Sequence, residues 1–341
     1  MEAAQSALEC SERVTVMNKK VKRVLIGSGV AAAGITALGT LSYAATKYLV
    51  KIAMDRELPK VKNLNKAKDQ VRGFEDVDAF YDGLENASLN LENCGCETVA
   101  IHSYDGERLA GHWYPCENAQ RIIVAMHGWR SSWSRDFGVI SEFWHQNGCS
   151  VLYAEQRGQN NSGGDYMGFG MMERYDCREW VKWVNTRNDA ELPIYLAGAS
   201  MGATTVLMTT GLELPDNVRG VIADCGFTSP HEIWKHVVEN NLHLSYGVIG
   251  NLASDICKKK IQMGTKDYST VEAMKECKIP VLFIHGADDH FVPVEMTYEN
   301  YKACTAPKRL FVVPGADHGM SYVADTQGYQ AAMKDFWSTL D

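Results

Sequence analysis

Residues 194–208 read IYLAGASMGATTVLM, and this stretch decides the fold class. An apolar run leads into GASMG at residues 198–202, a G-x-S-x-G pattern, and a helix-compatible apolar run follows. This order predicts a strand, a tight turn and a helix, with Ser200 exposed at the turn. The two glycines give the turn the freedom that a strained serine needs. The alternative is an ordinary strand-to-helix turn with a chance serine, so the rest of the chain has to decide.

Eight short segments have the character of β-strands. The first two are joined at Asp105-Gly106, a strong hairpin signal, and the later six are almost continuously apolar, as in parallel strands buried on both faces. Alternating strands and helices predict a doubly wound, mostly parallel α/β sheet with helices on both faces, led by an antiparallel hairpin. The expected strands are 97–104, 108–114, 121–126, 150–155, 194–197, 220–223, 281–284 and 309–313, and the expected helices are 136–146, 171–185, 201–210, 294–302 and 325–340.

The amino-terminal part of the chain differs in composition from the rest. Residues 1–23 form a basic segment, and residues 24–46 carry no charge and would span roughly 35 Å as a helix, enough to cross a bilayer core. This predicts a single-pass membrane anchor, with a cleaved signal peptide ending near Ser42-Tyr43-Ala44 or a soluble helix as alternatives. Five Lys/Arg lie within the 15 residues before the segment and four within the 15 residues after it, so its orientation does not follow from charge. Residues 47–93 are expected to form a linker and a helix over 71–84, and residues 94–341 the catalytic domain.

Charge and cysteine usage exclude some classes of protein. Residues 1–68 carry 12 Lys/Arg against 5 Asp/Glu, whereas residues 69–341 carry 22 against 37. An acidic main domain without a basic patch does not indicate a nucleic-acid partner. The ten cysteines are scattered without the spacing of a disulfide framework. Cys94 and Cys96 lack a second pair at suitable spacing, which disfavours a zinc site.

Polar residues follow the late strands where each strand ends. In doubly wound sheets the chemistry lies at the carboxyl ends of the strands. Ser200 follows the strand at 194–197, Asp289 lies in HGADDHFVP after the strand at 281–284, and His318 lies in PGADHG after the last strand. A serine, a carboxylate and a histidine therefore occur in this order at one predicted edge of the sheet, which favours a nucleophilic role for Ser200.

These motifs resemble the α/β-hydrolase superfamily over residues 94–341. The resemblance rests on the G-x-S-x-G turn, the HG after the third strand, the HG-x-x-D-x-x-VP block and the terminal D-H-G, and the RGQ at 157–159 is similar to bacterial serine esterases and serine aminopeptidases, several of which are membrane-anchored. It implies that Ser200 is the nucleophile, His318 the general base and Asp289 the group that orients the imidazole. It also implies an oxyanion hole made by the backbone amides of Met201 and Trp129.

Other residues compete for these roles. Asp288 precedes Asp289, and Asp224 follows the sixth strand, so either is an alternative acid; Asp317 beside His318 is expected to be a turn residue. His127 and His285 each precede a glycine at a strand end and are expected to hold loops by hydrogen bonds. GFG at 168–170 has no preceding strand or third glycine, which disfavours a dinucleotide site.

A small cap is expected as an insertion at about 225–278. Apolar residues at helical spacing run through Ile233 to Leu242, and a second helix is expected at 252–261; the apolar stripe either packs onto the sheet or gates the substrate. An apolar acyl pocket is predicted from residues near the strand ends, with these candidates: Trp129, Met201, Phe227, Trp234 and Tyr322.

The leading hypothesis is a membrane-anchored serine hydrolase that cleaves a carboxylic ester through an acyl-enzyme, without a metal or organic cofactor. A peptidase or aminopeptidase, a thioesterase and an acyltransferase are possible on the same residues. The expected partners are a small ester or short peptide and a membrane. A haloalkane dehalogenase is disfavoured, because its carboxylate nucleophile would stand where Ser200 does. The hypothesis of another class is a membrane-tethered binding protein without catalysis.

Overall fold

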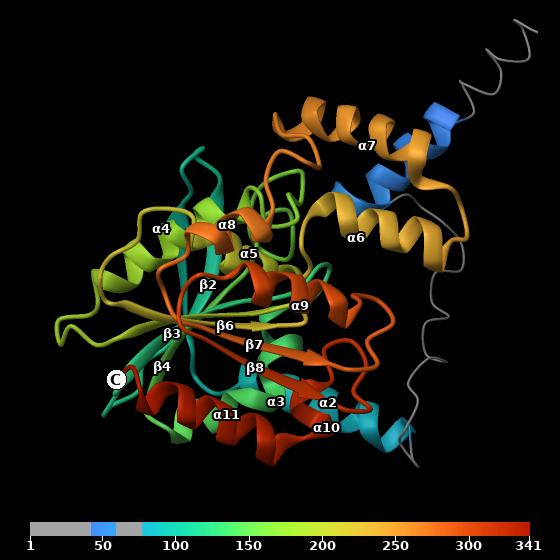
Figure 1. Cartoon of the computed structure of the whole chain (residues 1–341). Coiled ribbons are helices and arrows are strands. Elements are labelled where there is room, and N and C mark those ends of the chain that lie inside the picture. The colour runs from blue at the N-terminus through green and yellow to red at the C-terminus, as the bar shows by residue number, and fades with distance from the viewer. Residues whose placement is uncertain (1–41, 59–76) are drawn as a thin grey trace, which may run out of the picture. The chain divides into compact units, whose positions relative to one another are not determined.

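The computed structural model describes residues 42–58 and 77–341 (Figure 1). The chain divides into two compact units, Met1–Leu49 and Val50–Asp341. The second unit contains the whole sheet. Most of the expected anchor, residues 24–41, lies outside the described residues. Within the described ranges, no helix combines the length and the apolar character needed to cross a membrane. The anchor and the domain boundaries at 23, 46 and 93 stay predictions.

The expected eight-stranded sheet is present, in the order β1-β2-β4-β3-β5-β6-β7-β8. The pairs β1·β2 and β2·β4 are antiparallel and all other pairs are parallel. Every residue of β3, β4 and β7 is buried, which explains their unbroken apolar character. The strands are β1 (Glu97–His102), β2 (Arg108–Tyr114), β3 (Arg121–Met126), β4 (Cys149–Ala154), β5 (Ile194–Ala199), β6 (Val218–Asp224), β7 (Val281–Gly286) and β8 (Lys308–Val313).

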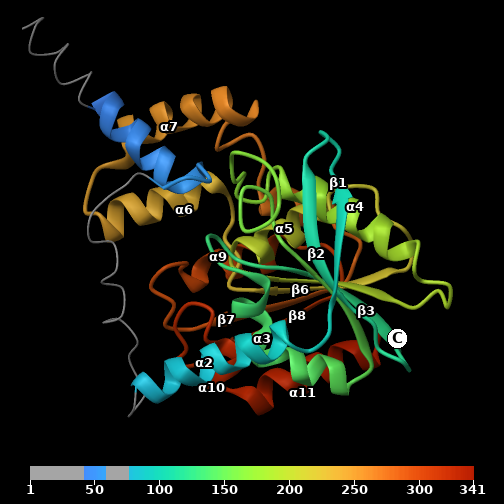
Figure 2. The ribbon, with the colours of Figure 1, turned by 180° about the vertical axis from the view of Figure 1, so that it is seen from behind.

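Helices cover both faces of the sheet and bury one apolar cluster on each side (Figures 1 and 2). This is the layered arrangement that the alternation of strands and helices predicts. One face is covered by α4 (Glu173–Asn185), α5 (Met201–Thr209), α8 (Thr270–Glu276) and α9 (Val294–Ala303). The other is covered by α2 (Val77–Glu92), α3 (Trp133–Gln146), α10 (Ser321–Ala324) and α11 (Thr326–Ser338).

Local hydrogen bonds set the ends of several elements where the sequence pattern does not. β1 stops at His102 rather than at 104 because Ser103 donates its amide to Glu107 O at 2.8 Å and so begins the hairpin turn. α11 starts at Thr326 because the Asp325 carboxylate accepts the Gly328 amide at 2.8 Å as an N-cap. The helix expected at 71–84 is displaced: α2 extends to Glu92, and residues 71–76 lie outside the described part.

The cap consists of α6 (Pro230–His236), a π-helical turn at Val237–Asn241 and α7 (Tyr246–Ile261). α6 begins at an N-cap, with the Ser229 hydroxyl accepting the Glu232 amide at 3.1 Å. Both views place α6 and α7 away from α2, α3 and α11 (Figures 1 and 2). Ile233, Trp234 and Val238 of the expected apolar stripe pack into a third cluster that includes Met201, the first residue of α5, whereas Leu242 is exposed.

Candidate active site

The turn between β5 and α5 holds Ser200 in a strained conformation, with φ 54° and ψ −117°. The two glycines of the motif are sterically required. A methyl group on Gly202 would lie 1.7 Å from Met126 O, and one on Gly198 would lie 2.3 Å from the backbone carbon of Gly202. Ser200 donates its amide to Asp224 O at 2.8 Å, which ties the turn to the next strand. The sharp turn therefore depends on close backbone packing that only glycine permits.

The structure brings the three residues predicted at the strand ends into one hydrogen-bonded line. His318 Nε2 lies 2.9 Å from Ser200 Oγ, and His318 Nδ1 lies 2.7 Å from Asp289 Oδ2. The Asp289 side chain is fully buried, whereas that of His318 is 25% exposed. With the proton on Nδ1, the neutral ring donates to Asp289 and leaves Nε2 free to accept from the Ser200 hydroxyl. The arrangement can withdraw a proton from Ser200.

The other acids weighed for this position lie elsewhere. Asp288 is exposed, and Asp224 accepts from the Ser321 hydroxyl at 3.0 Å. Asp317 accepts the backbone amides of His290 and His318 and is thus a turn residue, as expected. The carboxylate that contacts the His318 ring belongs to Asp289.

The loop after β3 runs beside Ser200, and hydrogen bonds from its backbone amides hold it in place. A methyl group on Gly128 would lie 3.4 Å from Ser200 Cβ. The Gly128 amide donates to Asp136 Oδ2 at 2.6 Å, and the Arg130 amide donates to Gln159 Oε1 at 2.5 Å. Between them, the Trp129 amide has no hydrogen-bond acceptor among the described residues. The loop therefore holds one free N–H beside the serine.

The amide of Met201 is the matching donor on the other side. It is the first amide of α5, whose early N–H groups have no partner within the helix. Within the described ranges it makes no hydrogen bond either. Two free backbone amides of this kind, next to a nucleophile, can bind a developing oxyanion.

Comparisons with known proteins concern the fold that carries this site. A family model described as "Serine aminopeptidase, S33" matches residues 117–276, which include Ser200 but neither Asp289 nor His318. The esterase Pf2001 of Pyrococcus furiosus superposes with a TM-score of 0.60 at 20% identity, over 72% of this chain and 91% of the esterase. The chain therefore has the α/β-hydrolase fold, and residues 117–276 are similar to this serine aminopeptidase family.

Two further similarities extend the comparison. The uncharacterized protein YqkD of Bacillus subtilis (strain 168) is 22% identical over 321 residues, which cover 94% of this chain and 99% of YqkD. The acylaminoacyl peptidase of Pyrococcus horikoshii superposes with a TM-score of 0.53 at 17% identity, over 72% of this chain and 41% of the peptidase. The fold is thus shared by esterases and peptidases.

Asp289 is held by four hydrogen-bonding partners. Its Oδ1 accepts the backbone amides of Phe291 at 2.9 Å and Val292 at 2.8 Å. Its Oδ2 lies 2.7 Å from His318 and 3.2 Å from His285 Nε2. Burial opposes ionisation, but the hydrogen bonds from His285 and His318 hold the pKa of Asp289 well below its usual value. The carboxylate is therefore charged and fixed in position.

His127 and His285 hold loops, as the sequence suggested. His127 Nδ1 lies 2.8 Å from Gly128 O, and Gln156 donates its amide to His127 Nε2 at 3.1 Å. His285 bridges Thr297 and the carbonyl of Val292 at 2.7 and 2.9 Å. The sequence did not indicate the additional contact of His285 with Asp289, because it depends on how the loop after β7 folds back.

Cys225 is a neighbour of the site that sequence reasoning missed. Its Sγ lies within 4.8 Å of one ligand atom each of Asp289 and His318, the one group in the described part of the chain with the composition of a metal site. Burial raises the pKa of Cys225 to about 11, so the thiol is neutral. Cys94 and Cys96, weighed as half of a zinc site, have their sulfurs 3.3 Å apart, and no third ligand of the described residues joins them.

Four of the five predicted pocket residues gather in the third cluster. Met201, Phe227 and Trp234 are buried there, and Trp129 packs against them through Phe169, which contacts three of the aromatic rings. Tyr322 does not join them. It belongs to the cluster on the opposite face of the sheet, packs on Tyr329 and accepts a hydrogen bond from Gln330 at 2.8 Å. Tyr322 lies on α10, which follows β8 and covers the opposite face of the sheet. It is therefore not part of the expected pocket.

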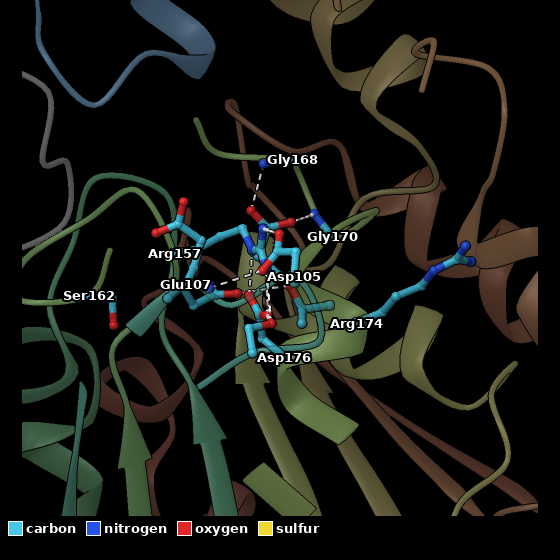
Figure 3. A network of polar contacts seen from close by, with 12 residues as sticks. Asp105, Glu107, Arg157, Ser162, Gly168, Gly170, Arg174 and Asp176 are labelled. Carbon is cyan, nitrogen blue, oxygen red and sulfur yellow. Dashed lines mark hydrogen bonds and ion pairs between the residues drawn. The ribbon is translucent and has the colours of Figure 1, made fainter. Parts of the chain in front are cut away.

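A buried ionic network supports residues 157–170, the loop whose Gln159 contacts the backbone next to Trp129 (Figure 3). The Arg157 guanidinium donates to Asp176 at 2.6 Å and to Asp105 at 2.7 Å, and Arg157 and Asp176 are each only 1% exposed. Glu173 accepts the amides of Gly168 and Gly170 at 2.6 and 2.9 Å. The network thus fixes both ends of residues 157–170, the loop that carries Gln159.

Proposed function

We propose that this α/β-hydrolase is a serine hydrolase that cleaves carboxylic esters through an acyl-enzyme, with Ser200, His318 and Asp289 as its catalytic residues. The observation that carries the proposal is the hydrogen-bonded line from Asp289 Oδ2 through the His318 ring to Ser200 Oγ, with contacts of 2.7 and 2.9 Å. The strained turn at Ser200 and the two free amides beside it support the same chemistry.

The reaction proceeds in two halves. Ser200 Oγ bonds to the ester carbon while its proton passes to His318 Nε2, and the amides of Met201 and Trp129 bind the oxyanion. The carbon–oxygen bond to the alcohol then breaks, and the alcohol leaves with the proton from His318. Water enters, gives its proton to His318 and attacks the acyl-enzyme. The acid is released as the proton returns to Ser200, so no co-reactant beyond water is required.

The residues near Ser200 favour an ester with an apolar acyl group. Met201, Phe227 and Trp234 form the buried apolar surface next to the first turn of α5, and Trp129 flanks it. Peptidase, aminopeptidase and thioesterase activities use the same residues and are the alternatives within this proposal. The hypothesis of a non-catalytic binding protein required Ser200 and His318 to lie too far apart to interact, whereas 2.9 Å separates them.

Fluorophosphonate labelling of the wild type and of Ser200→Ala tests the proposal. Wild type should be labelled and Ser200→Ala should not, and turnover of p-nitrophenyl esters should fall on the order of a millionfold in the variant. A parallel panel of aminoacyl p-nitroanilides and acyl thioesters identifies the preferred bond. A wild type that is neither labelled nor active on any of these substrates would refute the proposal.

We further propose that residues 24–46 anchor the protein in a membrane as a single span, with the side of the catalytic unit left open by the nearly balanced flanking charge. Fractionation of the expressed full-length chain tests this. It should pellet with membranes, resist alkaline carbonate and be released by detergent. Recovery in the supernatant without detergent would contradict the anchor.

A further inference from the structure

Residues 50–56, which we name the strap, lie against the loop after β3 although more than seventy positions separate them in sequence. The helix over residues 42–54 ends inside the strap, so its last carbonyls have no partner within the helix. The Trp129 indole N–H donates to Ala53 O at 2.8 Å. The Arg130 guanidinium donates to Ile52 O at 2.7 Å and to Asp55 O at 2.6 Å. Trp129 and Arg130 together therefore cap this helix end.

The strap is itself held firmly by other parts of the same unit. Met54 accepts the Met167 amide at 2.7 Å, and Arg56 donates to Asn160 O at 2.6 Å. Asp55 forms an ion pair with Lys260 of α7 at 2.8 Å. Val50 and Met54 are 2% and 1% exposed within the third apolar cluster. A segment with these contacts is a fixed support rather than a loose connection.

The backbone at Arg130 needs such a support. Its φ is 51°, in the left-handed region that a residue with a side chain adopts at a cost. The guanidinium contacts with the strap and the amide contact with Gln159 offset that cost. Because Trp129 immediately precedes Arg130 and its own indole is bound to the strap, the same contacts hold the segment that carries the free Trp129 amide.

We propose that the strap is part of the active site and that Arg130 is a positioning residue. Its hydrogen bonds to the strap carbonyls hold the Trp129 amide in the oxyanion hole. The inference rests on the proposed function of Ser200. An oxyanion contact forms mainly in the transition state, so its loss lowers kcat and leaves KM nearly unchanged. A residue that only supported the fold would instead lower stability without this kinetic signature.

Two variants of the full-length chain test the inference. Arg130→Lys keeps the charge but loses the forked donor that reaches two carbonyls. Trp129→Phe removes the indole N–H that donates to Ala53 and keeps an aromatic ring at this position. In each, kcat for a p-nitrophenyl ester should fall about 10- to 100-fold, with KM within about twofold of the wild type. The rate of fluorophosphonate labelling should fall by a similar factor. Arg187→Lys, an exposed arginine that pairs with Glu97, is the matched control and should behave as the wild type.

The outcomes separate the inference from the proposed function. If Ser200→Ala is inactive while Arg130→Lys and Trp129→Phe keep the kcat of the wild type, the role of the strap is overturned and the proposed function stands. If one variant fails to fold, as judged by thermal unfolding, the other decides. If both fold but raise KM instead of lowering kcat, the strap shapes substrate binding and the inference is wrong. A wild type without labelling or turnover overturns both.

Discussion

At the scale of single residues, the site depends on how the contacts of the Asp289 carboxylate are divided between its two oxygens. One of its carboxylate oxygens accepts two backbone amides, and the other faces His318 and His285. This leaves the oxygen that contacts His318 no freedom to turn away. The neighbouring carboxylate of Asp288 is exposed to solvent instead. Adjacent residues of the same type thus have different roles because the chain turns between them.

Asp289→Asn should lower kcat about 10⁴-fold, because the amide can neither hold His318 in the required tautomer nor stabilise the imidazolium. Asp288→Asn is the matched control and should keep the activity of the wild type. Steady-state kinetics on a p-nitrophenyl ester measures both. The assignment of the acid would be wrong if Asp288→Asn were the impaired variant.

The pH dependence of activity should report the ionisation of His318. Burial of the ring acts to lower its pKa, but the hydrogen bond to the charged Asp289 carboxylate raises the pKa of His318 well above its usual value. The protonated ring cannot accept the Ser200 proton, so kcat/KM should rise with pH and reach half its maximum above pH 6.5, the ordinary histidine value. A pH–rate profile between pH 5 and about 9 measures this. A plateau already reached below pH 6.5 would contradict it.

At the scale of elements, the turn from β5 to α5 is set by the distance between backbones. Gly202 lets α5 approach the end of β3, where Met126 O occupies the space that a side chain would need. The helix is almost entirely buried, so it cannot shift outwards without exposing apolar surface. The conformation of the turn at Ser200 therefore depends on this close packing.

Gly202→Ala should lower the free energy of unfolding by about 3 kcal/mol, because its methyl group would lie 1.7 Å from Met126 O. Gly247→Ala in α7 is the matched control: nothing lies within 4 Å of its added methyl group, and alanine is the better helix former. Urea unfolding monitored by circular dichroism compares them. Equal stability of the two variants would show that the β5–α5 packing is looser than described.

At the scale of the whole molecule, a series of hydrogen-bonded segments connects the β1–β2 hairpin to the loop after β3. Asp105 in the β1–β2 turn and Asp176 on α4 bind Arg157, and the loop that follows Arg157 presents Gln159 to the loop after β3. The strap supports that loop from the other side. The Trp129 amide is therefore fixed by segments from four parts of the sequence.

Arg157→Met should lower the free energy of unfolding by about 3–5 kcal/mol, because it leaves the buried carboxylate of Asp176 without its partner. Arg187→Met, which breaks the exposed pair with Glu97, is the control and should cost less than about 1 kcal/mol. Thermal and urea unfolding measure both. A similar effect of the two substitutions would mean that the network around Arg157 is solvated.

Local patterns were enough to predict the eight-stranded sheet, the alternation of its strands and helices along the chain, and the places of Ser200, Asp289 and His318 after their strands. Apolar periodicity marks buried strands, and a residue directly after a parallel strand must lie at the carboxyl edge of the sheet. Contacts between distant segments became visible only in the tertiary structure. They are the hydrogen bonds of Arg130 to the strap, the short distance between Cys225 and His318, and the place of Tyr322 on the other face of the sheet. These depend on how loops without periodicity fold across the sheet ends, and no spacing in the sequence specifies that.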